Sequence, residues 1–420
     1  MTLAESKELR PFPKYRHIPG GLDHAVKYAE KHDLYNKYSI VDLDVHEGDP
    51  FSCFAEYLPS KWKGKIGNED LLRKENEYLS NIGVRGSIAK SFAEQGFPQR
   101  LKEGRYTNAQ MWAFRRQLGH QRPEAWLINI DEILGVYLQR MKDLGIRKTF
   151  VLPGSIVFSI SQDARVDLEA DSCNAFTDFY LDKIAGKSDD IYTALPVPVR
   201  SPDKAVKLIE RAWNEKSIGA LYLLGSYDIQ AGDDSYFPIY EICNEKRIPI
   251  MFHADFDIGG YFESFVNYAA ISALCFPFQL VKHLTGIISE GIFERFPHLN
   301  FGFIEGGLSW VPWLISRLDL TFLERGRDSP WLSKLPSEYM AERCYFGTQP
   351  LENAPSVRGL KWIFDFFRER GMMKKIIYSS DYPHPDWDPP QGIHGLSFLN
   401  DEEKHLILGD NARTLMPKIR

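Results

Sequence analysis

Acidic and histidine side chains stand at the ends of short apolar runs, where they could share one metal ion. Asp44 and His46 end the run SIVDLDVH, and His253 ends the run IPIMFH. Glu305 ends the run LNFGFIE, and Asp381 follows the run IIYSS. Because side chains alternate along a strand, Asp44 and His46 would face the same way and bind one ion together. We therefore predict a metal site formed by Asp44, His46, His253 and Asp381.

The residue types at this site limit the metal without fixing it. Imidazole nitrogens and carboxylate oxygens suit zinc, manganese, iron or another divalent ion, and no thiolate narrows the choice. The runs LYLLG and CYFGTQP offer no ligand that could bridge a second ion. The expected cofactor is therefore one divalent metal ion, with zinc as the first choice and manganese, iron or magnesium as alternatives.

The apolar runs are spaced as strands that alternate with amphipathic helices. Eight strands are predicted, at residues 39–45, 148–153, 191–197, 218–224, 248–253, 299–305, 343–347 and 375–380. Helical spacing of apolar residues is clear at 203–216 and 280–296. Eight strands alternating with helices predict an α/β fold, a (β/α)8 TIM barrel, whose active site lies at the carboxyl ends of the strands.

Two regions fall outside this repeat. Residues 1–38 are interpreted as an N-terminal extension, and residues 39–420 as the metal-dependent barrel with an insertion at 50–124. A long insertion after the first strand would form a lid over the barrel mouth, or a solvated excursion on the surface. Its Arg85 and Arg105 could bind a substrate carboxylate bidentately.

Composition excludes several classes of partner. The 420 residues are 44% hydrophobic and carry a formal net charge of −6, without the basic excess that nucleic acid binding requires. No apolar run approaches the roughly 18 residues that span a bilayer, and the N-terminus lacks the apolar centre of a secretory signal. The five cysteines show no metal-finger spacing and are expected to be reduced. We expect a cytoplasmic protein that acts on a small molecule, with no nucleic acid or membrane partner.

Four segments together resemble a known family. They are IVDLDVHEGDP, MFHADFD, GIISEGIFERFPHLNFGFIEGGLSWVPWLISRLD and IIYSSDYPHPD. They are similar to the amidohydrolase-related family, in the amidohydrolase superfamily, which includes aminocarboxymuconate semialdehyde decarboxylase, resorcylate and carboxyvanillate decarboxylases, and meta-cleavage carbon–carbon hydrolases. The resemblance implies a metal-dependent barrel enzyme. It also implies a homo-oligomer, because relatives of this kind commonly pair.

The resemblance carries the metal ligands over by position. The family's His-x-His motif corresponds to Asp44 and His46, so the first ligand here is a carboxylate, as in some family members. The histidine of the fifth strand matches His253, and the aspartate of the eighth strand matches Asp381. In the SDYPHPD run, His384 could contact substrate or cap the following turn.

The sixth strand departs from the decarboxylases of this family. They place a histidine where the run FGFIEGG has Glu305. An ionised glutamate is an acceptor and a candidate base for metal-activated water, whereas imidazole can donate a proton. Glu305 could equally be a buried structural acid or a further metal ligand. With Asp381 and His253, it is nevertheless assigned to the catalytic group.

Three functions follow from these residues. Glu305 favours a metal-dependent hydrolase that cleaves a C–C or C–N bond next to a carbonyl in a small carboxylated or aromatic metabolite. The alternative is a metal-dependent non-oxidative decarboxylase, a lyase acting on an aromatic or unsaturated carboxylic acid. The third is an inactive structural barrel, suggested by Asp44 and Glu305 standing where histidines are usual.

Overall fold

The computed structural model describes seven parts of the chain, and they contain every strand of the predicted barrel. These parts are residues 21–46, 57–62, 130–153, 165–254, 268–352, 357–382 and 387–419. The strands form one eight-stranded parallel sheet in sequence order. They are β1 (Ile40–His46), β2 (Ile146–Leu152), β3 (Ile191–Pro196), β4 (Ile218–Leu224), β5 (Ile250–His253), β6 (Phe301–Ile304), β7 (Cys344–Gly347) and β8 (Ile376–Ile377).

Backbone hydrogen bonds join the first strand to the chain that follows the last one. The amide of Asp381 donates to the carbonyl of Asp44 at 2.8 Å, and the amide of His46 donates to the carbonyl of Tyr382 at 2.7 Å. These contacts close the sheet into the predicted barrel and set the end of β1 beside the segment after β8. Asp44, His46 and Asp381 therefore share one rim of the barrel.

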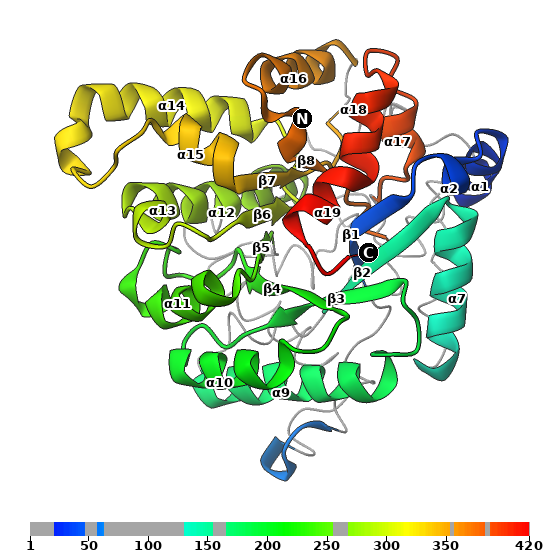
Figure 1. The fold of residues 1–420 in the computed structure, drawn as a ribbon, viewed down its shortest axis with the longest axis horizontal. Helices are drawn as coiled ribbons and strands as arrows, with labels where there is room; N and C mark the ends of the chain where they lie inside the picture. The colour runs from blue at the N-terminus through cyan, green and yellow to red at the C-terminus, as the bar shows by residue number, and fades with distance from the viewer. Residues whose placement is uncertain are drawn as a thin grey trace, which may run out of the picture.

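Helices surround the strands (Figure 1). The α-helices are α1 (Gly21–Lys31), α2 (Leu34–Lys37), α7 (Ile130–Asp143), α9 (Val166–Lys183), α10 (Pro202–Ala212), α11 (Phe237–Lys246), α12 (Tyr268–Ser289), α13 (Ile292–Arg295), α14 (Trp310–Arg325), α15 (Pro336–Arg343), α16 (Val357–Glu369), α17 (Gln391–His394), α18 (Asp401–His405) and α19 (Asn411–Leu415). Short helical turns are η3 (Ser60–Trp62), η7 (Asp234–Tyr236), η9 (Gly326–Asp328), η10 (Met372–Lys375) and η11 (Leu406–Asp410). The helix predicted at 280–296 is divided into α12 and α13, because Gly291 between them has a left-handed φ of 70°.

Aromatic packing between the sheet and the helices fixes which side chains face into the barrel. Phe252, Phe303 and Phe346 stack in a row across β5, β6 and β7, with ring centroids 5.7 and 6.0 Å apart. Phe252 also stacks on His283 of α12 at 4.9 Å, so this row faces the helices. Since neighbouring side chains on a strand point to opposite faces, His253 points into the barrel.

The C-terminal segment lies at the end of the barrel where the strands begin, opposite the rim that carries Asp44, His46 and Asp381. The Lys418 ammonium donates to the carbonyls of Glu215 at 2.9 Å and Ile218 at 3.0 Å, beside the start of β4. It also lies 3.5 Å from the centre of the Trp213 ring. The candidate metal site lies at the other rim, formed by the carboxyl ends of the strands.

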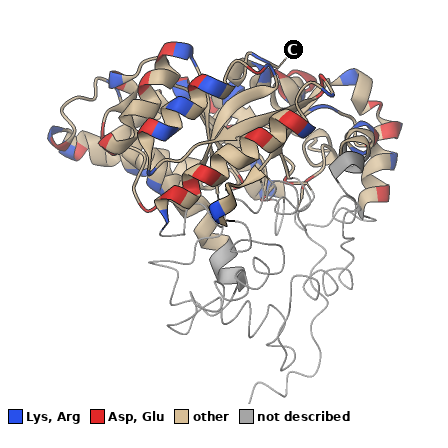
Figure 2. Ribbon diagram, turned by 90° about the horizontal axis from the view of Figure 1, so that it is seen from below, with Lys and Arg blue, Asp and Glu red and all other residues tan. Residues whose placement is uncertain are grey.

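The described helices show neither a basic surface nor a membrane-spanning segment. Basic and acidic residues are interspersed over the outer helices (Figure 2). Among the helices described, none is both long and apolar enough to cross a membrane.

Of the predicted insertion the structure describes 57–62, where the Trp62 indole donates to Asp171 of α9 at 2.8 Å. The proposed lid, including Arg85 and Arg105, otherwise lies outside the described residues.

Candidate metal centre

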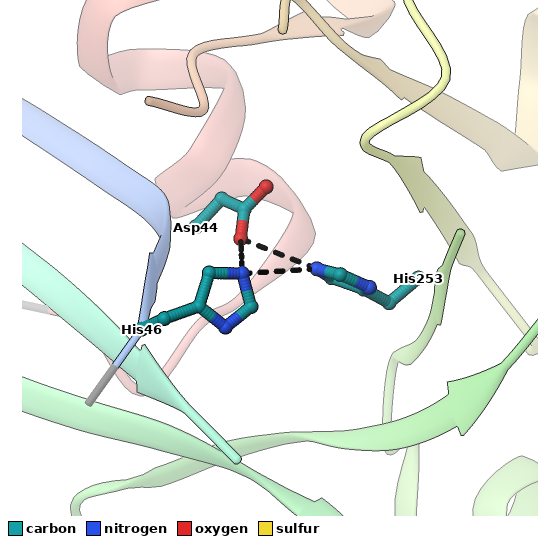
Figure 3. Close-up of side chains that lie close together, drawn as sticks. All are labelled: Asp44, His46 and His253. Carbon is teal, nitrogen blue, oxygen red and sulfur yellow. Dashed lines mark hydrogen bonds and ion pairs between the residues drawn. The ribbon is translucent and has the colours of Figure 1, made fainter. Parts of the chain in front are cut away.

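Three side chains from β1 and β5 converge at the rim (Figure 3). Nε2 of His46 lies 3.2 Å from Oδ1 of Asp44. Nε2 of His253 lies 3.4 Å from the same oxygen and 3.3 Å from Nε2 of His46. All three side chains are buried, and their potential ligand atoms lie within 4.8 Å of one another. This is a group that could hold one metal ion.

Asp381 adjoins this group through the same nitrogen of His46 that Asp44 contacts. Its Oδ1 lies 3.2 Å from Nε2 of His46. Its backbone has a left-handed φ of 62°, a conformation that costs energy for a residue with a side chain. The structure thus brings the four residues predicted as ligands together, with the Asp381 carboxylate turned toward the cluster.

The electrostatics of the cluster favour a bound positive charge. Burial alone would lower the pKa of His46, but hydrogen bonds with Asp381 and Asp44 raise it to about 10. Burial alone would raise the pKa of Asp44, but His253 and His46 hold it well below its usual range. The carboxylates create a negative potential that stabilises the protonated imidazole. The same potential would stabilise a divalent cation.

The donor set fits a divalent ion. Oδ2 of Asp44 is buried and has no hydrogen-bond partner within the parts of the chain that the structure describes. A buried carboxylate oxygen without a partner is costly, and coordination of a cation removes that cost. Two imidazole nitrogens with carboxylate oxygens suit a first-row divalent metal. The residues present therefore fit the predicted cofactor.

Glu305 contacts His253 on the side away from the cluster. Its Oε2 lies 3.2 Å from Nδ1 of His253, and the carbonyl oxygen of Ala254 lies against the same nitrogen. Both neighbours are acceptors, so Nδ1 of His253 carries the proton and donates to them. Nε2, which faces Asp44 and His46, would then supply a lone pair to a bound ion. A carboxylate behind a histidine in this way is typical of metal-binding histidines.

Two buried residues at this rim were not among the predicted site residues. Oδ1 of Asp42 accepts hydrogen bonds from the backbone amides of Asp44 at 3.2 Å and Ser380 at 2.9 Å, and burial raises the Asp42 pKa to about 8. Gln349 donates from Nε2 to Oδ2 of Asp381 at 3.0 Å. The signal for Asp42 was its two-residue spacing from Asp44, which predicts that both lie on one face of a regular strand.

Other predicted residues are separate from the cluster or outside the described residues. His384 lies outside them, as do Arg85 and Arg105. His283 of α12, a histidine separate from the cluster, is fully buried, and its Nε2 donates to the carbonyl of Gly225 at 2.9 Å. Burial lowers the pKa of His283 to about 3, so it is neutral at physiological pH.

The His283→Gln variant is expected to make stability less sensitive to acid. Because the pKa of His283 is about 3 in the folded chain and 6.5 for a histidine exposed to water, the unfolded chain binds more protons below pH 6.5. The free energy of unfolding therefore falls as the pH falls below 6.5, by about 2 kcal/mol at pH 5 from this residue. Glutamine can still donate to Gly225 but does not titrate.

Urea unfolding at pH 7.5 and pH 5 measures this effect. The loss of stability between the two pH values should be smaller in His283→Gln than in the wild-type protein. Equal losses in the two proteins would show that His283 is protonated in the folded state as readily as in the unfolded one.

The fold and the cluster define a (β/α)8 barrel with a candidate metal centre at its carboxyl rim. The family model described as Amidohydrolase matches residues 124–418. The chain therefore belongs to the amidohydrolase family, as its sequence motifs predicted. The match covers the barrel from the end of the predicted insertion to the C-terminal segment.

Individual relatives are distant. A curated protein of Dictyostelium discoideum, 2-amino-3-carboxymuconate-6-semialdehyde decarboxylase, is 24% identical over 220 residues, or 51% of this chain. The match spans 58% of the length of that relative. The sequence likeness is therefore confined to little more than half of each protein.

Solved structures share the fold. An amidohydrolase of Mycobacterium avium subsp. paratuberculosis has a TM-score of 0.63 and 18% identity, covering 90% of this chain and 99% of its own. A dihydroxybenzoic acid decarboxylase of Polaromonas sp., solved with manganese and the inhibitor 2-nitroresorcinol, has a TM-score of 0.59 and 14% identity, covering 91% and 98%. At these identities, the likeness supports the barrel fold.

Proposed function

We propose that this protein is a metal-dependent non-oxidative decarboxylase of an aromatic or unsaturated carboxylic acid. The observation that carries the proposal is the buried cluster of Asp44, His46 and His253, with Asp381 beside it, at the rim of an amidohydrolase barrel. Similarity to two decarboxylases, one of them solved with manganese, supports this reaction. The resident ion would be manganese or zinc, since the donor set suits both.

The roles of the residues follow from their positions. A divalent ion held by Asp44, His46, His253 and Asp381 would bind the substrate carboxylate and draw electron density away from the reacting carbon. In the reaction, the bond between that carbon and the carboxylate breaks, the electron pair stays on the carbon, and a proton replaces the departing carbon dioxide. Asp381 is our candidate for moving that proton, because it adjoins the cluster.

The sequence-based preference for hydrolysis rested on Glu305 as a base for water. The comparisons favour the decarboxylase alternative instead. The position of Glu305 gives it a role other than that of a base for water, because its carboxylate lies against Nδ1 of His253. A carboxylate held there accepts a hydrogen bond from the imidazole and strengthens it as a ligand, a role that both reactions can share. Glu305 is therefore no longer an argument for hydrolysis.

Product analysis tests the proposal. The protein is loaded with manganese and incubated with aromatic acids that carry a hydroxyl group beside the carboxylate, such as 2,6-dihydroxybenzoate. Release of carbon dioxide with the matching decarboxylated product is expected, and it should cease when the metal is removed with a chelator. Incorporation of oxygen from labelled water into a cleaved product, with no carbon dioxide, would establish hydrolysis and overturn the proposal.

A further inference from the structure

Gln349 occupies a fixed position between the loops that follow β6 and β8. Its side chain is buried, and its Nε2 donates to Oδ2 of Asp381 at 3.0 Å. Its backbone amide donates to Oγ of Ser379 at 3.2 Å, and its carbonyl accepts from the amide of Gly307 at 3.1 Å. Backbone and side chain of Gln349 are thus both held, and the side chain is directed at the carboxylate beside the metal centre.

The hydrogen bond to Asp381 settles the orientation of the Gln349 amide. An ionised carboxylate only accepts hydrogen bonds, so the NH2 group must face Oδ2 of Asp381. The carbonyl oxygen Oε1 then lies on the other side of the amide. Oε1 is buried, and the described residues supply no hydrogen-bond donor to it. A buried carbonyl oxygen without a donor is unfavourable, which makes it a receptive acceptor for a donor on a ligand.

We propose that Gln349 positions Asp381 through its NH2 group and selects the substrate through Oε1. The second contact requires a substrate with a hydroxyl or amino group near the carboxylate that is lost, since such a group can donate to Oε1. The inference rests on the proposed function, because it assigns Gln349 to the same centre. It deepens that function by specifying which carboxylic acids the site accepts.

Asn411, a second buried side-chain amide, allows the role of Gln349 at the metal centre to be distinguished from a general contribution to folding. Asn411 is also buried, and its Nδ2 donates to the carbonyls of Met373 at 2.9 Å and Ile376 at 2.7 Å, at the start of β8. Gln349 thus donates a hydrogen bond to the segment after β8, and Asn411 donates hydrogen bonds at the start of that strand. The Asn411→Leu variant is therefore a matched control for the Gln349→Met variant.

Manganese binding, measured by calorimetry on the full-length protein, tests the positioning role. Gln349→Met should bind Mn²⁺ about 10- to 100-fold more weakly than the wild-type protein, the usual effect of losing a partner of a metal ligand. Asn411→Leu should lower the melting temperature and leave Mn²⁺ affinity within about twofold. If Gln349→Met does not fold, Gln349→Asn, which keeps an amide but shortens its reach, should show the same direction of change.

Two outcomes of this titration have different meanings. Wild-type affinity for Mn²⁺ in a folded Gln349 variant would overturn the positioning role and leave the proposed function intact. A wild-type protein that binds no Mn²⁺ or Zn²⁺ would contradict the proposed function itself, and this inference with it.

Ligand preference tests the selecting role. At saturating Mn²⁺, binding of 2,6-dihydroxybenzoate is compared with binding of benzoate, which lacks the donor. The preference for the dihydroxy acid should fall about tenfold in Gln349→Met, the effect of one lost hydrogen bond. Asn411→Leu should keep the wild-type preference. An unchanged preference in Gln349→Met would overturn the selecting role.

Discussion

Replacement of His253 by alanine is expected to remove the bound metal and to lower activity about a hundredfold or more. The reason is that His253 contributes one of the two imidazole nitrogens that meet Asp44 at the rim. Loss of a residue that merely supports a metal ligand already costs about 10- to 100-fold in affinity or activity, so loss of a ligand itself should cost at least as much. Elemental analysis after manganese loading and dialysis, together with the carbon dioxide assay, measures both effects.

The His298→Ala variant is the control for this experiment. His298 lies on the surface just before β6, away from the cluster. It should retain about the wild-type metal content and activity. A His253→Ala protein that still held a full equivalent of manganese would show that the ion does not bind at this cluster.

Replacement of Glu305 by leucine is expected to weaken manganese binding about 10- to 100-fold. The hydrogen bond from Nδ1 of His253 keeps its Nε2 directed at the point where Asp44 and His46 meet. Leucine removes the carboxylate acceptor and leaves the carbonyl of Ala254 against Nδ1, whereas glutamine in Glu305→Gln keeps a side-chain acceptor and loses the charge. The loss should therefore be smaller in Glu305→Gln than in Glu305→Leu. Titration with Mn²⁺ gives the affinities of both variants.

The manganese affinities of the two variants distinguish a Glu305 that orients His253 from a Glu305 that acts as a base for water. A base for water would leave metal affinity unchanged in both variants and abolish a water-dependent reaction in each of them. Wild-type manganese affinity in a folded Glu305→Leu protein would therefore contradict the orienting role and restore the case for hydrolysis.

The fold was predictable because hydrophobic runs of strand length recur at regular spacing along the chain. The strand predicted at 218–224 has those bounds in the structure, and the others differ at their ends by a few residues. The largest difference is β8, which is limited to Ile376–Ile377 although 375–380 was predicted. The chain turns soon after β8 as it approaches β1, and Asp381 adopts its left-handed conformation there, which no local sequence pattern revealed.

The site was predictable as far as it depends on strand ends. Parallel strands bring their carboxyl ends to one rim, so Asp44, His46, His253 and Asp381 could be grouped without a structure. The contact between Glu305 and Nδ1 of His253 depends on the backbone after β6, where Glu305 has a φ of 62°. Gln349 was missed because a neutral amide is not a usual metal ligand, and its contact with Asp381 arises only in the folded barrel.

Diffraction from crystals grown with manganese, recorded near the manganese absorption edge, would locate the bound ion directly. One strong anomalous peak per chain is expected at the point where Asp44, His46 and His253 meet, with Asp381 beside it. No peak at that point, or a peak only at another place on the protein, would contradict the assignment of this cluster as the metal centre.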